Sequence, residues 1–171
     1  MAVPRHIRQF TLFVDGKNFI GTVSGLTPPK LTRKTEAYRG AGMLGAVNID
    51  LGLDDGALDA SFTTGGVEKE LLSKYAGQVD EVALRFVGEV FTDGEESQIL
   101  EIEMRGRITE IDQGEIKQGE ATSFTFAVKN TYYKESVDDS DVVEIDLLNF
   151  IYKKDGENVF GDRVSSALGL N

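Results

Sequence analysis

The stretch Thr27–Val47, TPPKLTRKTEAYRGAGMLGAV, poses a structural problem for the whole chain. It opens with two prolines, continues as a strand-like run over Lys30–Arg39, and closes in a loop that contains Gly40, Gly42 and Gly45. Both faces of the run are polar, whereas a strand that packs on its own core alternates apolar and polar side chains. We therefore predict that a neighbouring subunit, a partner or a water-filled channel completes this strand.

The glycine-rich end of the stretch exposes two apolar side chains, Met43 and Leu44. Apolar residues at the tip of a flexible loop suit insertion into a groove on a neighbouring molecule. A wide hairpin loop that folds over the end of its own domain is an equally good interpretation. The sequence leaves both interpretations open.

Length and composition favour one domain covering residues 1–171. The chain is 40% hydrophobic and 27% charged, which is ordinary for a globular protein. The absence of cysteine excludes disulfides and thiolate metal sites. There is neither a run of about 18 apolar residues nor the apolar core of a signal peptide. We therefore expect no membrane anchor, and synthesis in the cytoplasm.

The net charge of −11 has solubility as its simplest consequence. Proteins that bind nucleic acid tightly neutralise phosphates with Lys and Arg, and this chain has the opposite balance. We therefore do not expect sequence-specific DNA binding.

The first half of the chain predicts a hairpin, three more strands and one helix. Asp15-Gly16 is a strong two-residue turn signal, because glycine adopts positive φ at little cost. Val67–Ala76 predicts the clearest helix, with Val67 and Tyr75 on its apolar face and Gly77 at its end. The predicted strands are Phe10–Val14 and Phe19–Ser24 of the hairpin, then Lys30–Arg39, Val47–Leu53 and Leu58–Phe62.

The second half of the chain is almost all strand. Gly106 lies inside its longest apolar-alternating run and predicts a bulge or a bend. No fixed-period repeat and no alternation of strands with helices occurs. The predicted segments are the strands Val82–Val90, Ile99–Ile111, Ser123–Glu135, Val142–Leu148 and Phe150–Lys153, and a helix over Gly161–Leu168.

These elements predict a mainly β fold, a β-barrel or sandwich with one central α-helix and a short C-terminal helix. Strands of more than about 10 residues exceed the usual length of 5 to 6. Long strands either close a barrel or extend into a sheet that subunits share, because a long exposed edge invites aggregation.

Catalytic and metal-binding chemistry has little support in the sequence. The only histidine, His6, precedes the first strand, and Asp138–Asp141 lacks the ligand spacing of a calcium-binding loop. Asp112, Glu115 and Glu120 lie among glycines, and a polar loop explains them better than a pair of glycosidase carboxylates. We therefore predict a protein that is not an enzyme and has no cofactor and no metal site.

Short motifs spread over nearly the whole chain resemble the major tail tube protein family of contractile-tailed bacteriophages, which R-type bacteriocin tubes share. Each motif is weak alone, and their common order makes the resemblance specific. They are Pro29-Lys30-Leu31-Thr32, Glu36-Ala37-Tyr38-Arg39-Gly40, Gly42-Met43, Leu84-Arg85-Phe86, Met104-Arg105-Gly106-Arg107, Glu110-Ile111-Asp112, Lys117, Gly119-Glu120, Thr131-Tyr132-Tyr133-Lys134, Val143-Glu144-Ile145-Asp146 and Leu168-Gly169-Leu170.

The resemblance implies a structural protein whose hexameric rings stack into a hollow tube. Each subunit would lend strands to a continuous barrel around the lumen, through which DNA passes without tight binding. The implied partners are other copies of the chain, a contractile sheath, a tape-measure protein and baseplate proteins. The implied location is the tail of the virion, after assembly in the host bacterial cytoplasm. A soluble ligand- or carbohydrate-binding β-barrel module is the alternative.

Given the resemblance, the polar strand and its loop become candidates for contact with adjacent subunits. The arginines are candidates for ion pairs with a neighbour's carboxylates. The candidate interface residues are Lys30, Leu31, Thr32, Arg33, Glu36, Tyr38, Arg39, Gly40, Gly42, Met43, Leu44, Arg105 and Arg107.

Overall fold

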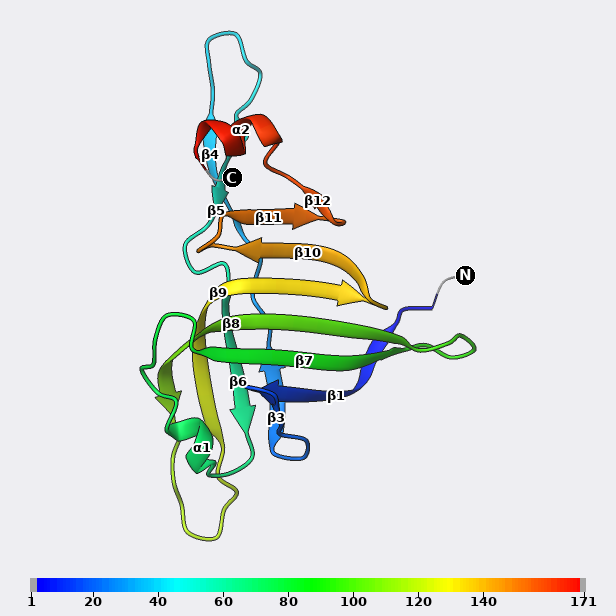
Figure 1. The fold of residues 1–171 in the computed structure, drawn as a ribbon, viewed down its shortest axis with the longest axis vertical. Coiled ribbons are helices and arrows are strands. Elements are labelled where there is room, and N and C mark those ends of the chain that lie inside the picture. Colours follow the sequence, from blue (N-terminus) through cyan, green and yellow to red (C-terminus); the bar gives the residue numbers. More distant parts are fainter. Residues whose placement is uncertain (1–2, 170–171) are drawn as a thin grey trace.

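The structure is a computed structural model that describes residues 3–169. In that range the chain forms strands joined by tight turns, with two short helices (Figure 1). The elements in chain order are β1 (His6–Val14), β2 (Lys17–Asn18), β3 (Val23–Thr27), β4 (Arg33–Tyr38), β5 (Val47–Leu53), β6 (Asp59–Thr64), α1 (Lys69–Leu72), β7 (Val82–Phe91), β8 (Gln98–Asp112), β9 (Phe124–Val137), β10 (Ser140–Asp146), β11 (Ile151–Lys154), β12 (Glu157–Asn158) and α2 (Asp162–Ala167).

The main sheet is antiparallel and forks at β9. Its strand order is β12-β11-β10-β9-β8-β7-β1-β2, and β6 and β3 branch from it. β9 serves two neighbours on one side because it is long: its first half pairs with β6 up to Lys129, and its second half pairs with β10 from Tyr132 onward. β8 pairs with β9 along both halves. The fork lets one sheet curl around a single core.

A bulge at Gly106 confirms the bend that the sequence predicts in the longest strand. The register between β8 and β9 shifts between Arg105 and Gly106, and it shifts again before Glu110. A Cβ atom on Gly106 would lie 2.1 Å from the carbonyl oxygen of Lys129. Only glycine lets the two backbones approach this closely, and bulges of this kind bend a strand.

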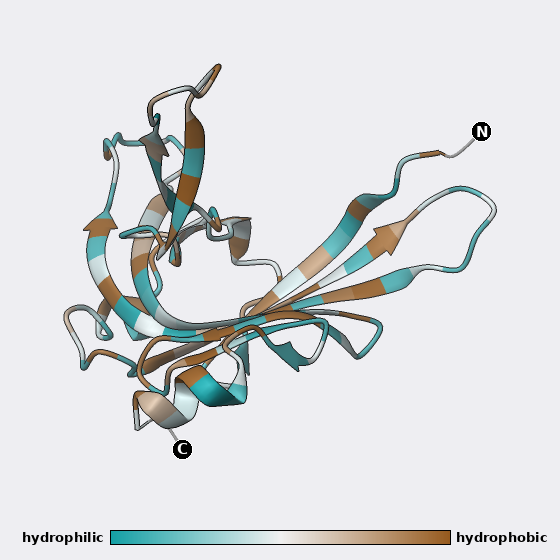
Figure 2. Cartoon of the chain, turned by 90° about the horizontal axis from the view of Figure 1, so that it is seen from above, coloured by the Kyte–Doolittle hydropathy of each residue, from teal (hydrophilic) through white to brown (hydrophobic). Residues whose placement is uncertain are grey.

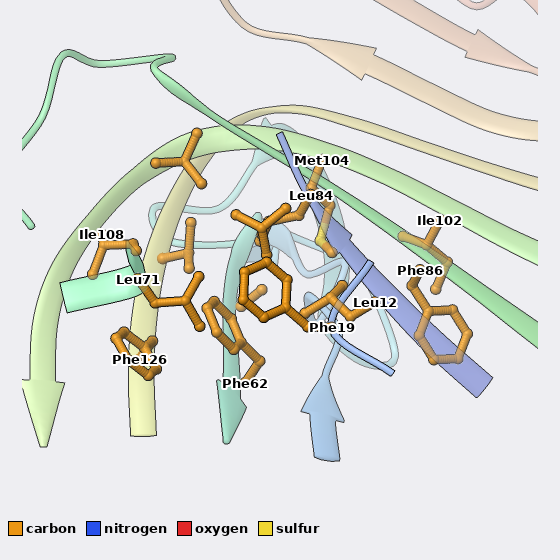
Figure 3. Close-up of a cluster of buried hydrophobic side chains, with 14 of the residues drawn as sticks. Leu12, Phe19, Phe62, Leu71, Leu84, Phe86, Ile102, Met104, Ile108 and Phe126 are labelled. Carbon is orange, nitrogen blue, oxygen red and sulfur yellow. The ribbon is translucent and has the colours of Figure 1, made fainter. Parts of the chain in front are cut away.

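The core fills the concave side of the curled sheet (Figure 3). Leu84, Met104 and Phe126 are buried, which confirms the inward faces predicted for the three long strands. Phe62 stacks on Phe126 with ring centroids 4.9 Å apart. Leu71 closes the core from α1. The fold is mainly β with two short helices, as predicted.

The prediction of Phe19–Ser24 as the returning strand of the first hairpin is wrong. Only Lys17 and Asn18 pair back onto β1, and Val23–Thr27 pairs with β6 instead. The reason is that the side chain of Phe19 is buried in the core. The chain therefore turns at this point, and the amides of residues 22 and 23 both donate hydrogen bonds to the carbonyl of Phe19.

The predicted ten-residue helix Val67–Ala76 is much shorter. It includes only Lys69–Leu72, and Val67 and Tyr75 are exposed rather than packed. The chain beyond the helix binds to β8 instead of continuing the helix, because the amide of Ala76 donates a hydrogen bond to the carbonyl of Ile108. The left-handed residue that ends the segment is therefore Ala76, at φ 57°, and not Gly77.

The sheet does not close into a barrel within one chain. In residues 3–169, β3 pairs only with β6, and β2 pairs only with β1. The short C-terminal helix α2 is present as predicted. None of the helices in this range is long and apolar enough to cross a membrane.

Candidate subunit interface

The polar strand predicted over Lys30–Arg39 forms half of a projecting hairpin. β4 and β5 make a separate two-stranded sheet that extends away from the main sheet (Figure 1). All six residues of β4 are exposed. A hydrogen bond from the amide of Asp54 to the carbonyl of Thr32, 2.9 Å long, closes its base. Two strands alone are marginally stable in water, so the hairpin calls for a covering surface.

One face of this hairpin carries exposed apolar side chains, and most of them come from β5. Register places Tyr38 opposite Val47 and Glu36 opposite Ile49, with Leu51 next along the same face. Val47, Ile49 and Leu51 are 55%, 46% and 54% exposed. Figure 2 shows hydrophobic and hydrophilic residues alternating along the hairpin. The interface residues predicted from the sequence do not include these three, although they alternate with Asn48 and Asp50 along the chain.

The opposite face of the hairpin is held to its own chain. Nε of Arg33 lies 2.9 Å from Oδ2 of Asp50, and the guanidinium lies 5.5 Å from the ring centre of Tyr152. This hydrogen bond from Arg33, with a second from the amide of Gly52, holds the pKa of Asp50 below its ordinary value. Gly52 has φ 115°, which permits the shift in register beside Arg33. Arg33 thus already has a carboxylate partner within the chain.

The two apolar residues of the loop behave differently. Leu44 is fully exposed at the tip. Met43 is half-buried, because its sulfur accepts a 3.0 Å hydrogen bond from the amide of Gly40 and the side chain folds back into the loop. Gly42 turns the chain here with φ 85°. Arg39 lies next to the tip, with Nη2 3.4 Å from the carbonyl oxygen of Leu44.

The remaining candidate residues lie in two other places. Lys30, Leu31 and Thr32 form the connection into the hairpin, where the hydroxyl of Thr32 donates to the carbonyl of Lys30. Arg105 and Arg107 lie in β8 of the main sheet, not in the hairpin. The guanidinium of Arg105 lies 4.7 Å from the ring centre of Tyr132. The candidates therefore divide between the hairpin with its entry and the outward face of the main sheet.

That outward face carries a row of alternating charges that the sequence analysis did not foresee. Strand register aligns one residue from each of five neighbouring strands. The row is Arg85 of β7, Glu103 of β8, Lys134 of β9, Glu144 of β10 and Lys153 of β11. Opposite charges on neighbouring strands stabilise a sheet. This face is therefore adapted to water rather than to a second core.

Diagonal ion pairs tie the row together. Glu101 accepts two hydrogen bonds from Arg85, at 2.8 and 3.0 Å, which lower the pKa of its carboxyl. Burial raises the pKa of the neighbouring Glu103, and a hydrogen bond with Glu101 raises it further. Lys134 lies 3.2 Å from Asp141. The pKa of Glu101 is thus lowered, whereas the pKa of the neighbouring Glu103 is raised.

β1 and β3 are among the strands of the described chain that present free edges. Along the first part of β1, residues 6–11 face β7 on one side only, because β2 meets β1 near Phe13 and Val14. β3 faces β6 on one side only. Free edges carry unpaired amides and carbonyls, which a further strand can satisfy.

A mainly β chain with a filled interior, free edges and an uncovered hairpin defines a structural protein that is completed by assembly. Similarity to known proteins shows its family. Residues 4–169 match the family model described as phage tail tube protein FII, and the chain belongs to this family. The resemblance seen in the sequence is therefore confirmed.

Two relatives support the assignment along the full length. The major tail tube protein of Serratia phage KSP20 is 62% identical over 170 residues, which is 99% of this chain and of that protein. The tail tube protein of Escherichia phage P2 is 43% identical over 159 residues, covering 91% of this chain and 92% of that protein. The chain is thus a structural protein of the phage tail and not an enzyme.

A solved structure supports the fold alone. A chain in the cryo-EM structure of the anti-feeding prophage baseplate, 6-fold symmetrised, aligns with a TM-score of 0.52 and 11% identity. The alignment covers 81% of this chain and 99% of that chain. Phe62 and Phe126 fill the interior of the curled sheet, which does not favour the alternative of a ligand-binding barrel.

Proposed function

We propose that this chain is the repeating subunit of a hollow tail tube, built from six-membered rings that stack along one axis. The observation that carries the proposal is the β4–β5 hairpin, whose apolar face has no cover within the chain. Exposed apolar surface of this kind marks sites of protein association. The six-fold symmetry of the baseplate that contains the similar fold supports the ring size.

Within a ring, the free edges of β1 and β3 are the edges that a neighbouring copy completes. Pairing one edge with the next around a closed ring leaves no edge exposed. The bend and fork of the main sheet support this arrangement, because a curved sheet fits the wall of a barrel better than a flat one. The long strands β8 and β9 would form the middle of each subunit's share of the wall.

The hairpin covers its apolar face on an adjacent copy. Tyr38, Val47, Ile49 and Leu51 supply the contact, together with the interface residues that the sequence predicts in the hairpin and its entry. Burying the exposed half of one such aliphatic side chain contributes about 1 kcal/mol. Every subunit repeats the contact, and the small contribution is therefore multiplied along the tube.

The assembled tube has further partners in this proposal. A contractile sheath surrounds it, a tape-measure protein occupies the lumen during assembly, and a baseplate meets one end. DNA passes through the lumen without tight binding. The net charge of −11 supports this last point, because DNA adheres where a surface neutralises phosphates with free cations.

The proposal is tested by negative-stain microscopy of the purified protein over a range of concentrations, with sedimentation velocity in parallel. We expect tubes of constant diameter whose end-on averages have six-fold symmetry. A species that sediments as a single subunit at every concentration would contradict the proposal. Rings that do not stack would confirm the closed ring and contradict the tube.

A further inference from the structure

The turn between β10 and β11 exposes a group of large apolar side chains. Leu147, Leu148 and Phe150 lie in this turn, and Phe160 follows β12 nearby. We call these four residues the C-terminal patch. A hollow of about 220 Å³ lies beside them, lined by Leu147, Phe150 and Phe160 and by residues at the base of the hairpin. Each side chain of the patch is about half exposed, so the described chain leaves the patch largely uncovered.

A buried carboxylate holds this turn in shape. Oδ1 of Asp146 accepts hydrogen bonds from the amides of Leu148 and Asn149, both 3.0 Å long. Oδ2 of Asp146 accepts a third, 2.7 Å long, from the side-chain amide of Asn149. Hydrogen bonds to a charged carboxylate are among the stronger ones. The turn therefore presents its apolar side chains in one fixed arrangement.

Phe150 has a backbone conformation that suits glycine. Its φ is 55°, which a bulky residue rarely adopts because its Cβ crowds the backbone. The other residues with positive φ in the described range are glycines, four aspartates and Ala76. Because 62% of the Phe150 side chain is exposed, it adds little to the core of its own chain. Backbone strain at an exposed aromatic residue indicates a use outside the single chain.

A groove of matching apolar character lies beside the free edges of β1 and β3. Its volume is about 310 Å³, and we call it the edge groove. Strand order places β10 to β12 toward one end of the main sheet and β1 toward the other (Figure 1). The residues that line the edge groove are Ile7, Leu26, Pro28, Pro29, Leu31, Phe86, Leu100, Ile102, Tyr133 and Glu135.

We infer that the C-terminal patch of one copy packs into the edge groove of the next copy in the same ring, with the side chain of Phe150 inserted. The inference rests on the proposed function and adds which two surfaces meet around the ring. The edge groove adjoins the edges of β1 and β3 that the proposed function already gives to a neighbouring copy. Contact between two different surfaces is heterologous, and such contacts close into a ring when the rotation between copies fits.

Phe150→Gly removes the side chain but keeps the turn. Glycine adopts positive φ without strain, and we therefore expect the midpoint of urea unfolding to stay the same or to rise. The concentration needed for tubes, measured by pelleting and electron microscopy, should rise by about tenfold or more, because every subunit loses an apolar contact.

Asp155→Gly is the matched control for this substitution. Asp155 also has positive φ, 51°, and lies in the next turn of the chain, outside the C-terminal patch. It should leave the concentration needed for tubes unchanged.

A cross-link tests directly which two surfaces meet. The chain has no cysteine, so two introduced cysteines are the only thiols. Tubes of the double variant Phe150→Cys with Leu31→Cys are treated with a short bismaleimide and separated on a denaturing gel. We expect a ladder of covalent products that ends at six copies, because the contact lies within a closed ring. The control pair Phe150→Cys with Lys129→Cys, in which position 129 lies in β9 away from the edge groove, should give single chains.

Tubes of the double variant that give no ladder, or a ladder that continues beyond six copies, would overturn the inference and leave the proposed function standing. Tubes formed by Phe150→Gly at the wild-type concentration would also overturn it, and would leave the C-terminal patch to a different protein of the tail. A wild-type protein that forms no tubes would contradict the proposed function and this contact with it.

Discussion

A Cβ atom at position 106 would collide with the backbone of the neighbouring strand. Gly106 faces the carbonyl of Lys129 at the bulge, where β8 turns from one half of the sheet to the other. The contact is with backbone, which cannot rotate aside as a side chain could. The bend of β8 at this bulge therefore requires a residue without a Cβ atom.

Gly106→Ala is expected to lower the free energy of unfolding by about 3 kcal/mol, because the two strands must separate to admit the methyl group. Urea unfolding followed by circular dichroism measures the change. Gly25→Ala is the matched control, since no atom lies within 4 Å of the added group and its φ is not positive. Equal effects of the two substitutions would contradict this account of the bulge.

The residues at the hairpin tip show what sequence can and cannot provide at this scale. The exposed position of Leu44 follows from its place in a glycine-rich loop and agrees with the prediction from the sequence. Met43 looks equivalent in the sequence, but its sulfur folds back onto the amide of Gly40. Such a contact depends on the angles of the turn, which no pattern of residue types specifies.

At the scale of elements, two carboxyl groups of β8, those of Glu101 and Glu103, lie side by side on the charged outward face of the sheet. Arg85 from β7 and Lys134 from β9 face them, and Glu101 is the carboxyl that takes the hydrogen bonds of Arg85. Glu103 is left with the higher pKa, above its ordinary value of 4.5, chiefly because it is partly buried. Its proton therefore stabilises the fold.

The stability that protonated Glu103 contributes is fully present below the unfolded pKa and is lost as pH rises through the folded pKa. Glu103→Gln cannot lose a proton. We therefore expect the stability of the variant, relative to wild type, to increase as pH rises from about 4 to 7. Urea unfolding at a series of pH values measures it. Parallel stability curves for the two proteins would show that Glu103 does not titrate in this way.

The hairpin is the element whose substitution separates folding from assembly. Ile49→Asp places a charge on this exposed face without touching the core. We expect the free energy of unfolding to fall by about 1 kcal/mol, because the new carboxylate lies opposite Glu36 in β4. The concentration needed for tubes is expected to rise by about tenfold or more, because the charge must be buried on a neighbouring copy. Pelleting and circular dichroism measure the two effects.

Val159→Asp is the control for this change. Val159 is 49% exposed, close to the 46% of Ile49, and lies next to β12, outside the hairpin. The control should leave tube formation unchanged. Tubes formed equally well by the Ile49→Asp variant would remove the hairpin from the interface.

Alternation of residue types predicted the long strands well, because one side of each faces a core and the other faces water. Val82–Val90 is an example, and its inward side chains are those expected from the sequence. The helix at Val67–Ala76 was overestimated because its end depends on capture by Ile108, far away in the chain. The hairpin prediction failed at Phe19 for the same reason, because its side chain is buried in a core built from residues far away in the sequence.

At the scale of the whole molecule, the interface predicted from the sequence includes the polar strand of the hairpin but not the exposed apolar residues beside it. The polar run Lys30–Arg39 marked a strand without cover, and the structure places most of it in the projecting hairpin. The missing residues, Val47, Ile49 and Leu51, belong to the partner strand. A face shared by two strands becomes visible only when their register is known. The fork at β9 and the charge row depend on register in the same way.

In the proposed ring, the free edges of β1 and β3 would also govern the order of assembly. An incomplete ring ends in two unpaired strand edges, whatever its number of subunits, and only the closed ring has none. Each added copy forms one edge contact, whereas the copy that closes the ring forms two, so open arcs come apart more readily than the closed ring. The population should pass abruptly from single copies to whole circles, with almost nothing in between.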